Sequence, residues 1–386
     1  MMLCKNPGAP PGPSERRVYI PLCGISHGMQ GMQKPTVQDI EKINQGGDGP
    51  APVQNRPASA GLGGQAPLKL ILENIGPIKA AEIELGRVTV LYGPNAAGKT
   101  TVARAIEYAI KLMNSIGVDC SELTELVNYG AKVGKVVLND YEISLERSED
   151  FEKVSVTVKR GAETLHSGEC RVGNYLTGLH IAGDLGVDFL VWVRYDNVKI
   201  VGLESEGIYN LTDLFRVSQI GKYLSKSNSP AKIAESYDKY KTDINHDLSL
   251  VVNGWLDVQD TELFFNDYDN FYKLDHVADG IKRAALIIAA KHIAERMREL
   301  GRSPVVFIES FEFPLHIDYI RSLLGVLEKG NVPVIIETHS GYVLKYAVTK
   351  GWRVYVIEDG NAFTDLSKPE LFKAERAAVS ELAGIL

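Results

Sequence analysis

Residues 91–101 read "LYGPNAAGKTT", and the segment from Gly93 to Thr100 fits G-x-x-x-x-G-K-[ST], the Walker A or P-loop pattern. Glycines let successive backbone N–H groups turn towards phosphate oxygens, and a helix that starts here points its positive end at the same anion. The Lys99 ammonium can reach the β- and γ-phosphates, and the Thr100 hydroxyl can ligate Mg²⁺. The pattern predicts a nucleotide site formed by Gly93, Pro94, Asn95, Ala96, Ala97, Gly98, Lys99, Thr100 and Thr101.

The segments before and after this loop have the residue patterns of strands and of a helix, respectively. Residues 68–75, 81–86 and 87–93 are rich in β-branched and apolar residues and predict strands. Residues 101–117 place apolar side chains at helical spacing, with Gly117 as the expected C-cap. A strand, a glycine-rich loop and a helix in this order favour a phosphate-binding loop over a tight turn without a ligand.

The rest of the chain predicts an α/β fold. Runs over about 131–170 predict an antiparallel β-meander, and residues 187–195 predict a further strand. Residues about 205–275 are more polar and predict a mostly helical insertion. From residue 276 helices alternate with short apolar strands, which favours a mostly parallel core sheet flanked by helices.

Residues 1–66 differ from the ordered segment expected at 67–386. They are rich in Pro, Gly and small residues and show no sustained periodicity. Such a segment cannot bury enough apolar surface to offset its ordering entropy, so we expect a disordered tail. A functional tether and an artefact of start-site choice are the alternatives.

Composition limits which cellular compartment and which binding partners we expect. The chain has 386 residues and a formal net charge of -7, which argues against a basic coat for nucleic acid but not against a local patch. No apolar run reaches the roughly 20 residues that span a bilayer, and no signal peptide is evident, so we expect no membrane contact. Cys4, Cys23, Cys120 and Cys170 are scattered without a CxxC pair. We therefore expect neither a disulfide framework nor structural zinc, and a cytoplasmic location.

Acidic and polar residues follow the late strands. Glu309 ends the apolar run "VVFIE", where a buried strand can deliver a carboxylate as a second Mg²⁺ anchor. His339 follows the strand expected at 332–338, although a lone histidine at a strand end is usually a polar cap. Asp279 and Gly280 precede a helix that could also receive an anion. No N-K-x-D element is found, which disfavours a GTPase.

In this order and spacing, the segments resemble one family. It is the ABC-type ATPase head of structural-maintenance-of-chromosomes (SMC) proteins, RecF and the ATPase part of overcoming-lysogenization-defect (OLD) nucleases. The N-I-G turn and G-P-N-x-x-G-K-T loop resemble the start of these heads. "ESFEFPLH" resembles their D-E-P-E-x-x-L-H segment, "THS" their switch-histidine motif, and "VADGIKRAALI" their signature segment. The resemblance covers about 67–140 and 276–360.

The resemblance implies a role for each matching residue. Thr100 and Glu309 would hold Mg²⁺, and His339 would sense the γ-phosphate of ATP. Asp279, Gly280 and Lys282 would face the nucleotide of a partner subunit, which implies a homodimer with ATP sandwiched between two heads. DNA and a separate effector chain such as a nuclease are the further partners that the analogy suggests.

Three departures from the family bear on hydrolysis. Ser310 stands where the family has its catalytic Glu, and a serine hydroxyl cannot replace a carboxylate base. Glu312 could substitute, or Glu309 could do both jobs; in another register Glu309 is the base and Ile308 occupies the metal position. Asp279 replaces the usual serine, which requires a compensating cation such as Lys282 or Arg283. No glutamine matches the family's Q-loop, whose place Arg194 could occupy.

Absent motifs exclude some relatives. The chain has no long heptad arm, no CxxC hook and no L-S-G-G-Q transporter signature. Only about two dozen residues follow "VYVIEDG", so we expect no C-terminal nuclease domain. Three functions stay open: a slow ATPase, a non-hydrolysing ATP-dependent dimerisation switch, and the ATPase half of a two-gene system. DNA repair, defence or genome maintenance is suggested by analogy alone.

Overall fold

The loop at 93–98 follows a strand in the parallel part of a fourteen-stranded sheet. The computed structural model describes residues 68–114, 116–176, 185–202 and 205–370, and the tail expected at 1–66 lies outside them. Within these residues the sheet order is β12-β11-β10-β16-β17-β3-β18-β19-β2-β1-β5-β6-β7-β8. The strands are β1 (Lys69–Ile75), β2 (Ile78–Glu84), β3 (Val88–Tyr92), β5 (Val133–Leu138), β6 (Tyr141–Arg147), β7 (Lys153–Arg160), β8 (Glu163–Arg171), β10 (Phe189–Val193), β11 (Asn197–Gly202), β12 (Ser205–Asn210), β16 (Pro304–Ile308), β17 (Val334–Thr338), β18 (Arg353–Glu358) and β19 (Asn361–Phe363).

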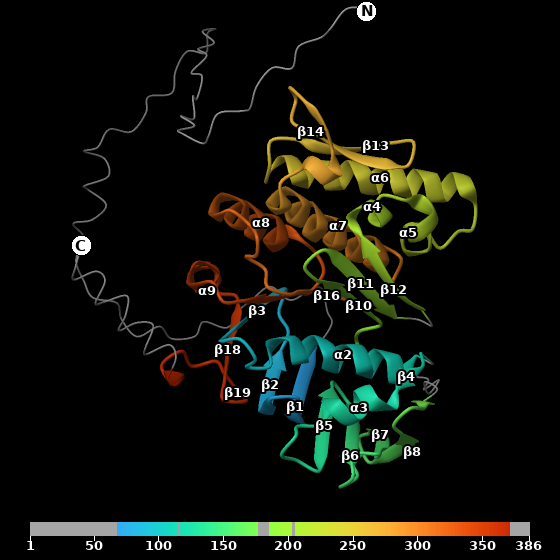
Figure 1. Cartoon of the computed structure of the whole chain (residues 1–386), viewed down its shortest axis with the longest axis vertical. Helices are drawn as coiled ribbons and strands as arrows, with labels where there is room; N and C mark the ends of the chain where they lie inside the picture. Colours follow the sequence, from blue (N-terminus) through green and yellow to red (C-terminus); the bar gives the residue numbers. More distant parts are fainter. Residues whose placement is uncertain (1–67, 115, 177–184, 203–204, 371–386) are drawn as a thin grey trace, which may run out of the picture. The chain divides into compact units, whose positions relative to one another are not determined.

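Helices cover this sheet and two small sheets accompany it (Figure 1). The helices are α2 (Lys99–Met113), α3 (Cys120–Leu126), α4 (Leu211–Leu214), α5 (Val217–Leu224), α6 (Pro230–Ser249), α7 (Asp279–Glu299), α8 (Ile317–Lys329) and α9 (Gly341–Thr349), with a 3-10 turn η1 (Leu274–His276). The small sheets pair β4 (Val118–Asp119) with β9 (Tyr175–Leu176), and β13 (Trp255–Gln259) with β14 (Glu262–Asn266) and β15 (Phe271–Lys273). No helix among the described residues is long and apolar enough to cross a membrane.

The parallel core confirms the α/β fold class expected from the sequence. Neighbouring strands in the run β10-β16-β17-β3-β18 all pair in parallel. Four of them, β3, β10, β16 and β17, are buried along their whole length, which explains their short, continuously apolar sequences. Because their carboxyl ends lie at one edge, the residues after them meet there.

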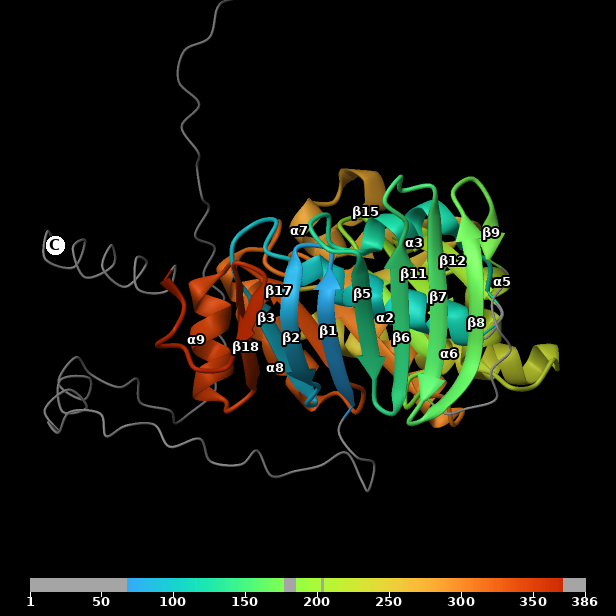
Figure 2. The same cartoon turned by 90° about the horizontal axis from the view of Figure 1, so that it is seen from below.

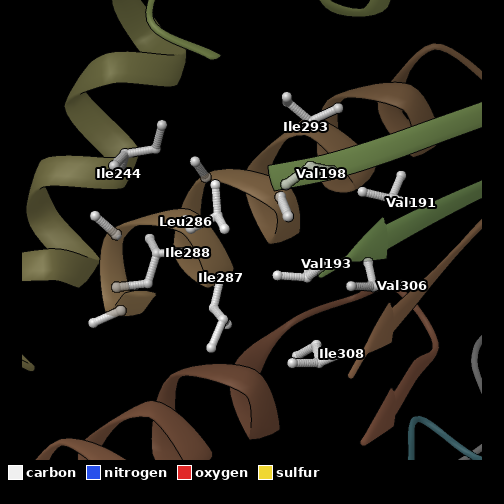
Figure 3. Close-up of a cluster of buried hydrophobic side chains, with 14 of the residues drawn as sticks. Val191, Val193, Val198, Ile244, Leu286, Ile287, Ile288, Ile293, Val306 and Ile308 are labelled. Carbon is white, nitrogen blue, oxygen red and sulfur yellow. The ribbon is translucent and has the colours of Figure 1, made fainter. Parts of the chain in front are cut away.

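Each face of the parallel core packs against its own helices. On one face, Val191, Val193, Val306 and Ile308 meet α7, and α6 packs on the other side of α7, as Figure 3 shows. On the other face, Leu190 and Phe307 pack against α2, in one core with β1, β2 and the meander. The strands β5 to β8 pair antiparallel and extend the sheet from β1 (Figure 2). Helix α2 is buried nearly all round because it has sheet strands on two sides.

Two local expectations differ from the structure. Helix α2 ends at Met113 rather than at Gly117, because Asn114 caps it and donates its side-chain amide to the Ile110 carbonyl. The insertion at 205–275 is helical only over α4 to α6. Its last part forms the antiparallel strands β13 to β15, whose aromatic residues suit a pleated surface.

A disulfide joins two cysteines that show no pairing signal in the sequence. Cys120 at the start of α3 and Cys170 near the end of β8 are both buried, with their Cα atoms 5.7 Å apart. They lie 50 residues apart in sequence, so no short spacing signals the pair. The expectation of unpaired cysteines is therefore wrong for these two residues.

Cys170→Ser should destabilise the oxidised protein. Loss of a native disulfide removes a constraint on the unfolded chain and typically costs about 2–5 kcal/mol. We expect a free energy of unfolding lower by this amount in urea titrations of the non-reduced protein. In reducing agent the two proteins should differ little. Four free thiols in the non-reduced wild type would contradict the disulfide.

A buried charge cluster joins α6 to α7. The His292 ring contacts the carboxylates of Asp247, at 2.9 Å, and Glu295, at 3.1 Å, and the Lys291 ammonium contacts the same two carboxylates. Burial alone would lower the pKa of His292, but the hydrogen bonds to Asp247 and Glu295 outweigh it and raise the pKa. Burial likewise opposes ionisation of Asp247, yet its bonds with His292 and Lys291 lower its pKa to about 2.

These shifts predict two pH limits on stability. The charge on His292 stabilises the fold fully below its unfolded pKa, about 6.5, and this contribution is lost as the pH rises through its higher folded pKa. Asp247 contributes above its unfolded pKa, about 3.8, and its contribution is lost as the pH falls towards 2. We expect the urea midpoint to fall between pH 6 and pH 8.5 in wild type. That decline should be smaller in His292→Gln, and an equal decline would contradict the assignment.

Candidate functional site

The loop between β3 and α2 has a backbone that only certain residues adopt. Ala96 has φ 61° and Gly98 has φ 107°, both in the left-handed region. A Cβ on Gly98 would lie 2.7 Å from the Ile78 Cγ1 atom, so this position requires glycine. The sharp turn places the N-terminal N–H groups of α2 where a phosphate can accept from them.

Lys99 lies inside the loop that precedes it. Its side chain is only 3% exposed, and its ammonium donates to the carbonyl oxygens of Gly93, at 2.9 Å, and Pro94, at 2.7 Å. Burial lowers the pKa of Lys99, and the charges of Glu337 and Glu312 oppose that effect. These carbonyls hold the ammonium at the loop, where it can turn to phosphate oxygens.

A carboxylate that was not among the predicted site residues contacts Thr100. Glu337, in β17, accepts a hydrogen bond from the Thr100 hydroxyl at 2.9 Å. Burial raises the pKa of Glu337 to about 7; the Thr100 bond and the Lys99 charge oppose the shift, while the charges of Glu309 and Glu312 add to it. The buried acid therefore lies among one cation and two further acids.

Glu309 lies at the end of β16, one strand further from the loop. Its carboxylate accepts from the Trp192 indole Nε1 atom at 3.1 Å. Arg283, on the first turn of α7, donates to the backbone carbonyl oxygens of Glu309, Arg194 and Tyr195. Burial lowers the pKa of Arg283 to about 10, with Glu309 opposing. This guanidinium fastens α7 to the ends of β10 and β16.

Glu312 turns back from the loop after β16 towards the end of β17. Its carboxylate accepts from the Thr338 hydroxyl at 2.7 Å and from the His339 backbone N–H at 2.8 Å. Burial and the Lys99 charge lower the pKa of His339, so its ring is neutral at pH 7. The structure thus brings Glu309, Glu312 and His339 to the edge of the sheet that carries the loop.

The signature residues lie on the first turn of α7. Asp279 pairs with Lys282 at 3.1 Å, so Lys282 is the cation that compensates this carboxylate, while Arg283 binds backbone carbonyls instead. A Cβ on Gly280 would meet the Pro314 carbonyl at 3.3 Å, so this turn packs on the segment after β16. Their role towards a partner subunit stays a prediction.

The Lys- and Tyr-rich segment at 237–243 is part of the packing of α6. Tyr240 is fully buried, and Tyr237 donates its hydroxyl to the Phe215 carbonyl. Lys241 pairs with Asp238 on the same helix at 3.4 Å. This arrangement gives no support to a DNA contact by this segment, and DNA binding stays a prediction.

The oxygen atoms at the loop suit Mg²⁺. A threonine hydroxyl and a carboxylate are hard donors, and Mg²⁺ typically takes one or two protein carboxylates and completes its shell with phosphate oxygens and water. The described residues, those at the loop included, contain no group of three or more His, Cys, Asp or Glu side chains that could hold a metal ion by themselves. Thr100, Glu337 and Glu309 are the candidates to hold it with a bound nucleotide.

A cavity of about 570 Å³ lies between the β1–β2 turn, helix α3 and the antiparallel meander, and no residue of the loop 93–98 lines it. Its lining includes Gly76, Pro77, Asn128, Tyr129, Arg147 and Phe151. A Cβ on Gly76 would lie 3.0 Å from the Thr101 hydroxyl oxygen, so the cavity adjoins the start of α2. The Arg147 guanidinium lies 4.1 Å from the centre of the Phe151 ring, which keeps a flat aromatic wall in place.

Comparison with known proteins agrees with this geometry. Residues 69–250, just under half of the chain, match the family model of the AAA domain. No curated protein sequence matches the chain. The fold is similar to an SMC head bound to the C-winged helix domain of ScpA, with 11% identity, 77% of this chain and 97% of that chain covered, and a TM-score of 0.49.

Two further solved structures have lower TM-scores. An SMC head domain from Thermotoga maritima has 14% identity, covers 77% of this chain and 97% of its own, and has a TM-score of 0.37. The recombination mediator RecF with ATP has 16% identity, covers 78% and 99%, and has a TM-score of 0.40. Residues 69–250 therefore match an AAA domain, and the described residues have an α/β fold with a G-x-x-x-x-G-K-T loop between a parallel strand and a helix.

Sequence reasoning missed Glu337 and Trp192, and it considered Arg283 only as a cation that could compensate Asp279. All three act through contacts between distant segments. One signal was available for Glu337, since an acid at the end of the apolar run "VIIE" parallels Glu309 after "VVFI". Trp192 lies in an apolar strand, where nothing in the sequence marks it.

Gly98→Ala should destroy the loop. The added Cβ clashes with Ile78 and the left-handed backbone is strained, which costs about 1–3 kcal/mol and misplaces the N–H groups. We expect a lower melting temperature and loss of binding of a fluorescent ATP analogue. Gly117→Ala is the matched control, because nothing lies within 4 Å of its added Cβ. Normal nucleotide binding by Gly98→Ala would exclude this loop geometry.

Proposed function

We propose that this protein binds ATP with Mg²⁺ at the loop 93–101 and hydrolyses it slowly, as a homodimer with ATP sandwiched between two heads. The observation that supports this most directly is the loop geometry. A buried Lys99 ammonium and a Thr100 hydroxyl with a carboxylate partner lie at the start of a buried helix. Together they match the needs of a bound triphosphate.

The cavity that adjoins the start of α2 supports a nucleoside, rather than a phosphate ion alone, as the ligand. Tyr129 is 85% exposed at its rim, and the Phe151 ring and Pro77 supply apolar surface. An adenine base binds well against such a surface, because stacking removes two flat faces from water. The triphosphate then lies along the loop from this cavity towards Lys99.

Hydrolysis requires a base for the attacking water. Mg²⁺ neutralises charge on the β- and γ-phosphate oxygens when it is bound with ATP. Glu312 and Glu309 are the two carboxylates that could accept the proton of the water as its oxygen attacks the γ-phosphorus and ADP leaves. Glu312 is held by Thr338 and by the His339 N–H, which places it next to the residue expected to contact the γ-phosphate.

A non-hydrolysing switch is the second candidate function, and Ser310 favours it. This residue follows Glu309 at the position where the resemblance expects the catalytic acid, and its backbone has φ 46°. With no carboxylate there, ATP would hold two heads together without turnover. The protein would then regulate an effector by dimerising on ATP.

The remaining features of the proposal concern partners and location. Asp279, Gly280 and Lys282 would face the nucleotide of the second subunit. The similar SMC head is bound to a domain of ScpA. By analogy we propose that this head also engages a separate effector chain or DNA. A role in DNA repair, defence or genome maintenance completes the proposal. We also propose a cytoplasmic location, where the reducing environment would keep Cys120 and Cys170 as thiols.

ATP turnover and oligomeric state separate the two candidates. In the full chain with Mg²⁺, we expect slow ATP turnover and a doubling of mass by light scattering when ATP is present. Lys99→Ala should lower nucleotide affinity about 10- to 100-fold, because it removes charge-assisted hydrogen bonds. Glu312→Gln should lower turnover about 100-fold yet retain the ATP-bound dimer, because it removes only the base.

Each other outcome has a definite meaning. Binding and dimerisation without turnover in wild type favour the switch. Unchanged turnover in Glu312→Gln assigns the base to Glu309. If Lys99→Ala leaves both assays unchanged, the loop is not the nucleotide site and the proposal fails.

A further inference from the structure

Glu337 is the carboxylate that contacts the hydroxyl of Thr100. Strand β17 lies between β3 and β16, and Glu337 pairs with Leu91 in β3. Glu309, after β16, is therefore one strand further from the loop. The acid that contacts Thr100 belongs to the strand beside the loop, whereas the sequence resemblance assigned the metal to the strand beyond it.

We propose that Glu337, and not Glu309, is the carboxylate that anchors Mg²⁺ beside Thr100. This inference rests on the proposed binding of ATP with Mg²⁺. It assigns a metal-holding role to a residue in the middle strand of three, and leaves Glu309 with a different role.

The distance between the two oxygens supports the assignment. Neighbouring ligands of an octahedral Mg²⁺ at about 2.0–2.1 Å lie about 2.9 Å from each other. The Thr100 Oγ1 and Glu337 Oε2 atoms are 2.9 Å apart. This hydrogen-bond distance is also compatible with two adjacent ligands, so both oxygens could bind one metal ion if the hydroxyl proton of Thr100 turned away from Glu337.

Glu309 is engaged by other groups. Its carboxylate accepts from the Trp192 indole at 3.1 Å, and its backbone carbonyl accepts from Arg283. Trp192 is 5% exposed and its ring packs against Phe307 with centroids 6.0 Å apart, so the indole is fixed. One carboxylate oxygen of Glu309 is thus held by the indole, whereas an oxygen of Glu337 already contacts the Thr100 hydroxyl.

The charges around Glu337 also favour a cation. The side chain is 5% exposed, and Lys99 is the cation that acts on it, while Glu309 and Glu312 add negative charge. A buried carboxylate in an excess of negative charge is costly unless a further cation is bound. When Lys99 turns to the phosphates of a nucleotide, a divalent cation is the group that restores the balance.

The test compares nucleotide affinity with Mg²⁺ and with EDTA in the full chain. The probe is a fluorescent ATP analogue, and the variants are Glu337→Gln and Glu309→Gln. We expect Mg²⁺ to tighten binding by wild type at least about 10-fold, since two charge-assisted contacts to the metal are gained. Glu337→Gln should lose that gain and bind equally well or more tightly in EDTA, because a repulsive charge near the phosphates is removed.

A second measurement detects the metal without activity. Mn²⁺ replaces Mg²⁺, and its electron paramagnetic resonance signal reports metal bound together with ADP. Glu337→Gln should lose the bound signal, and Glu337→Asp, which keeps the charge, should recover part of it. If Glu337→Gln does not fold, the Asp variant gives the answer by the same signal, because a ligand one methylene shorter must alter Mn²⁺ affinity.

The outcomes separate the inference from the function on which it rests. If Glu309→Gln abolishes the magnesium dependence and Glu337→Gln keeps it, this inference is overturned and the nucleotide site stands. If wild type binds no nucleotide under either condition, the proposed function and this inference fall together.

Discussion

Strand β17 is hydrogen-bonded between β3 and β16, and the chemistry of the site depends on this placement. The three strands are parallel and buried, so the residues that follow them lie at one edge. The loop with Lys99 and Thr100 follows β3, Glu309 and Glu312 follow β16, and Glu337 lies within the end of β17. The three groups of residues lie far apart in the sequence. The order of the strands in the sheet brings their side chains together.

This arrangement concentrates negatively charged side chains in a buried part of the site. Three carboxylates lie near the Lys99 ammonium and the Arg283 guanidinium, and burial raises the pKa of Glu337 to about 7. A protein that holds such a cluster without a ligand gives up stability for a site that is ready for cations. The ion pairs between α6 and α7, by contrast, are nearly balanced in charge, and they join two helices away from this edge.

The sequence was most informative where local rules apply. The P-loop depends on glycines and a lysine at fixed spacing, and the parallel strands show as short apolar runs, so both could be predicted. Glu309 and His339 could be found because they follow such runs directly. The Cys120–Cys170 disulfide and the Trp192–Glu309 bond could not, because each depends on which distant segments the folded chain places side by side. For Glu337, resemblance directed attention to β16 and away from its neighbour.

Arg283 fixes the position of helix α7 on the sheet. One guanidinium on α7 holds carbonyl oxygens at the ends of both β10 and β16, and the side chain is 2% exposed. A buried charge that keeps only some of its partners is costly, so intermediate positions of the helix are disfavoured. The first turn of α7 can therefore either stay latched to the sheet or come free as a unit. Any signal that passes between the sheet edge and this helix should be a discrete step and not a graded drift.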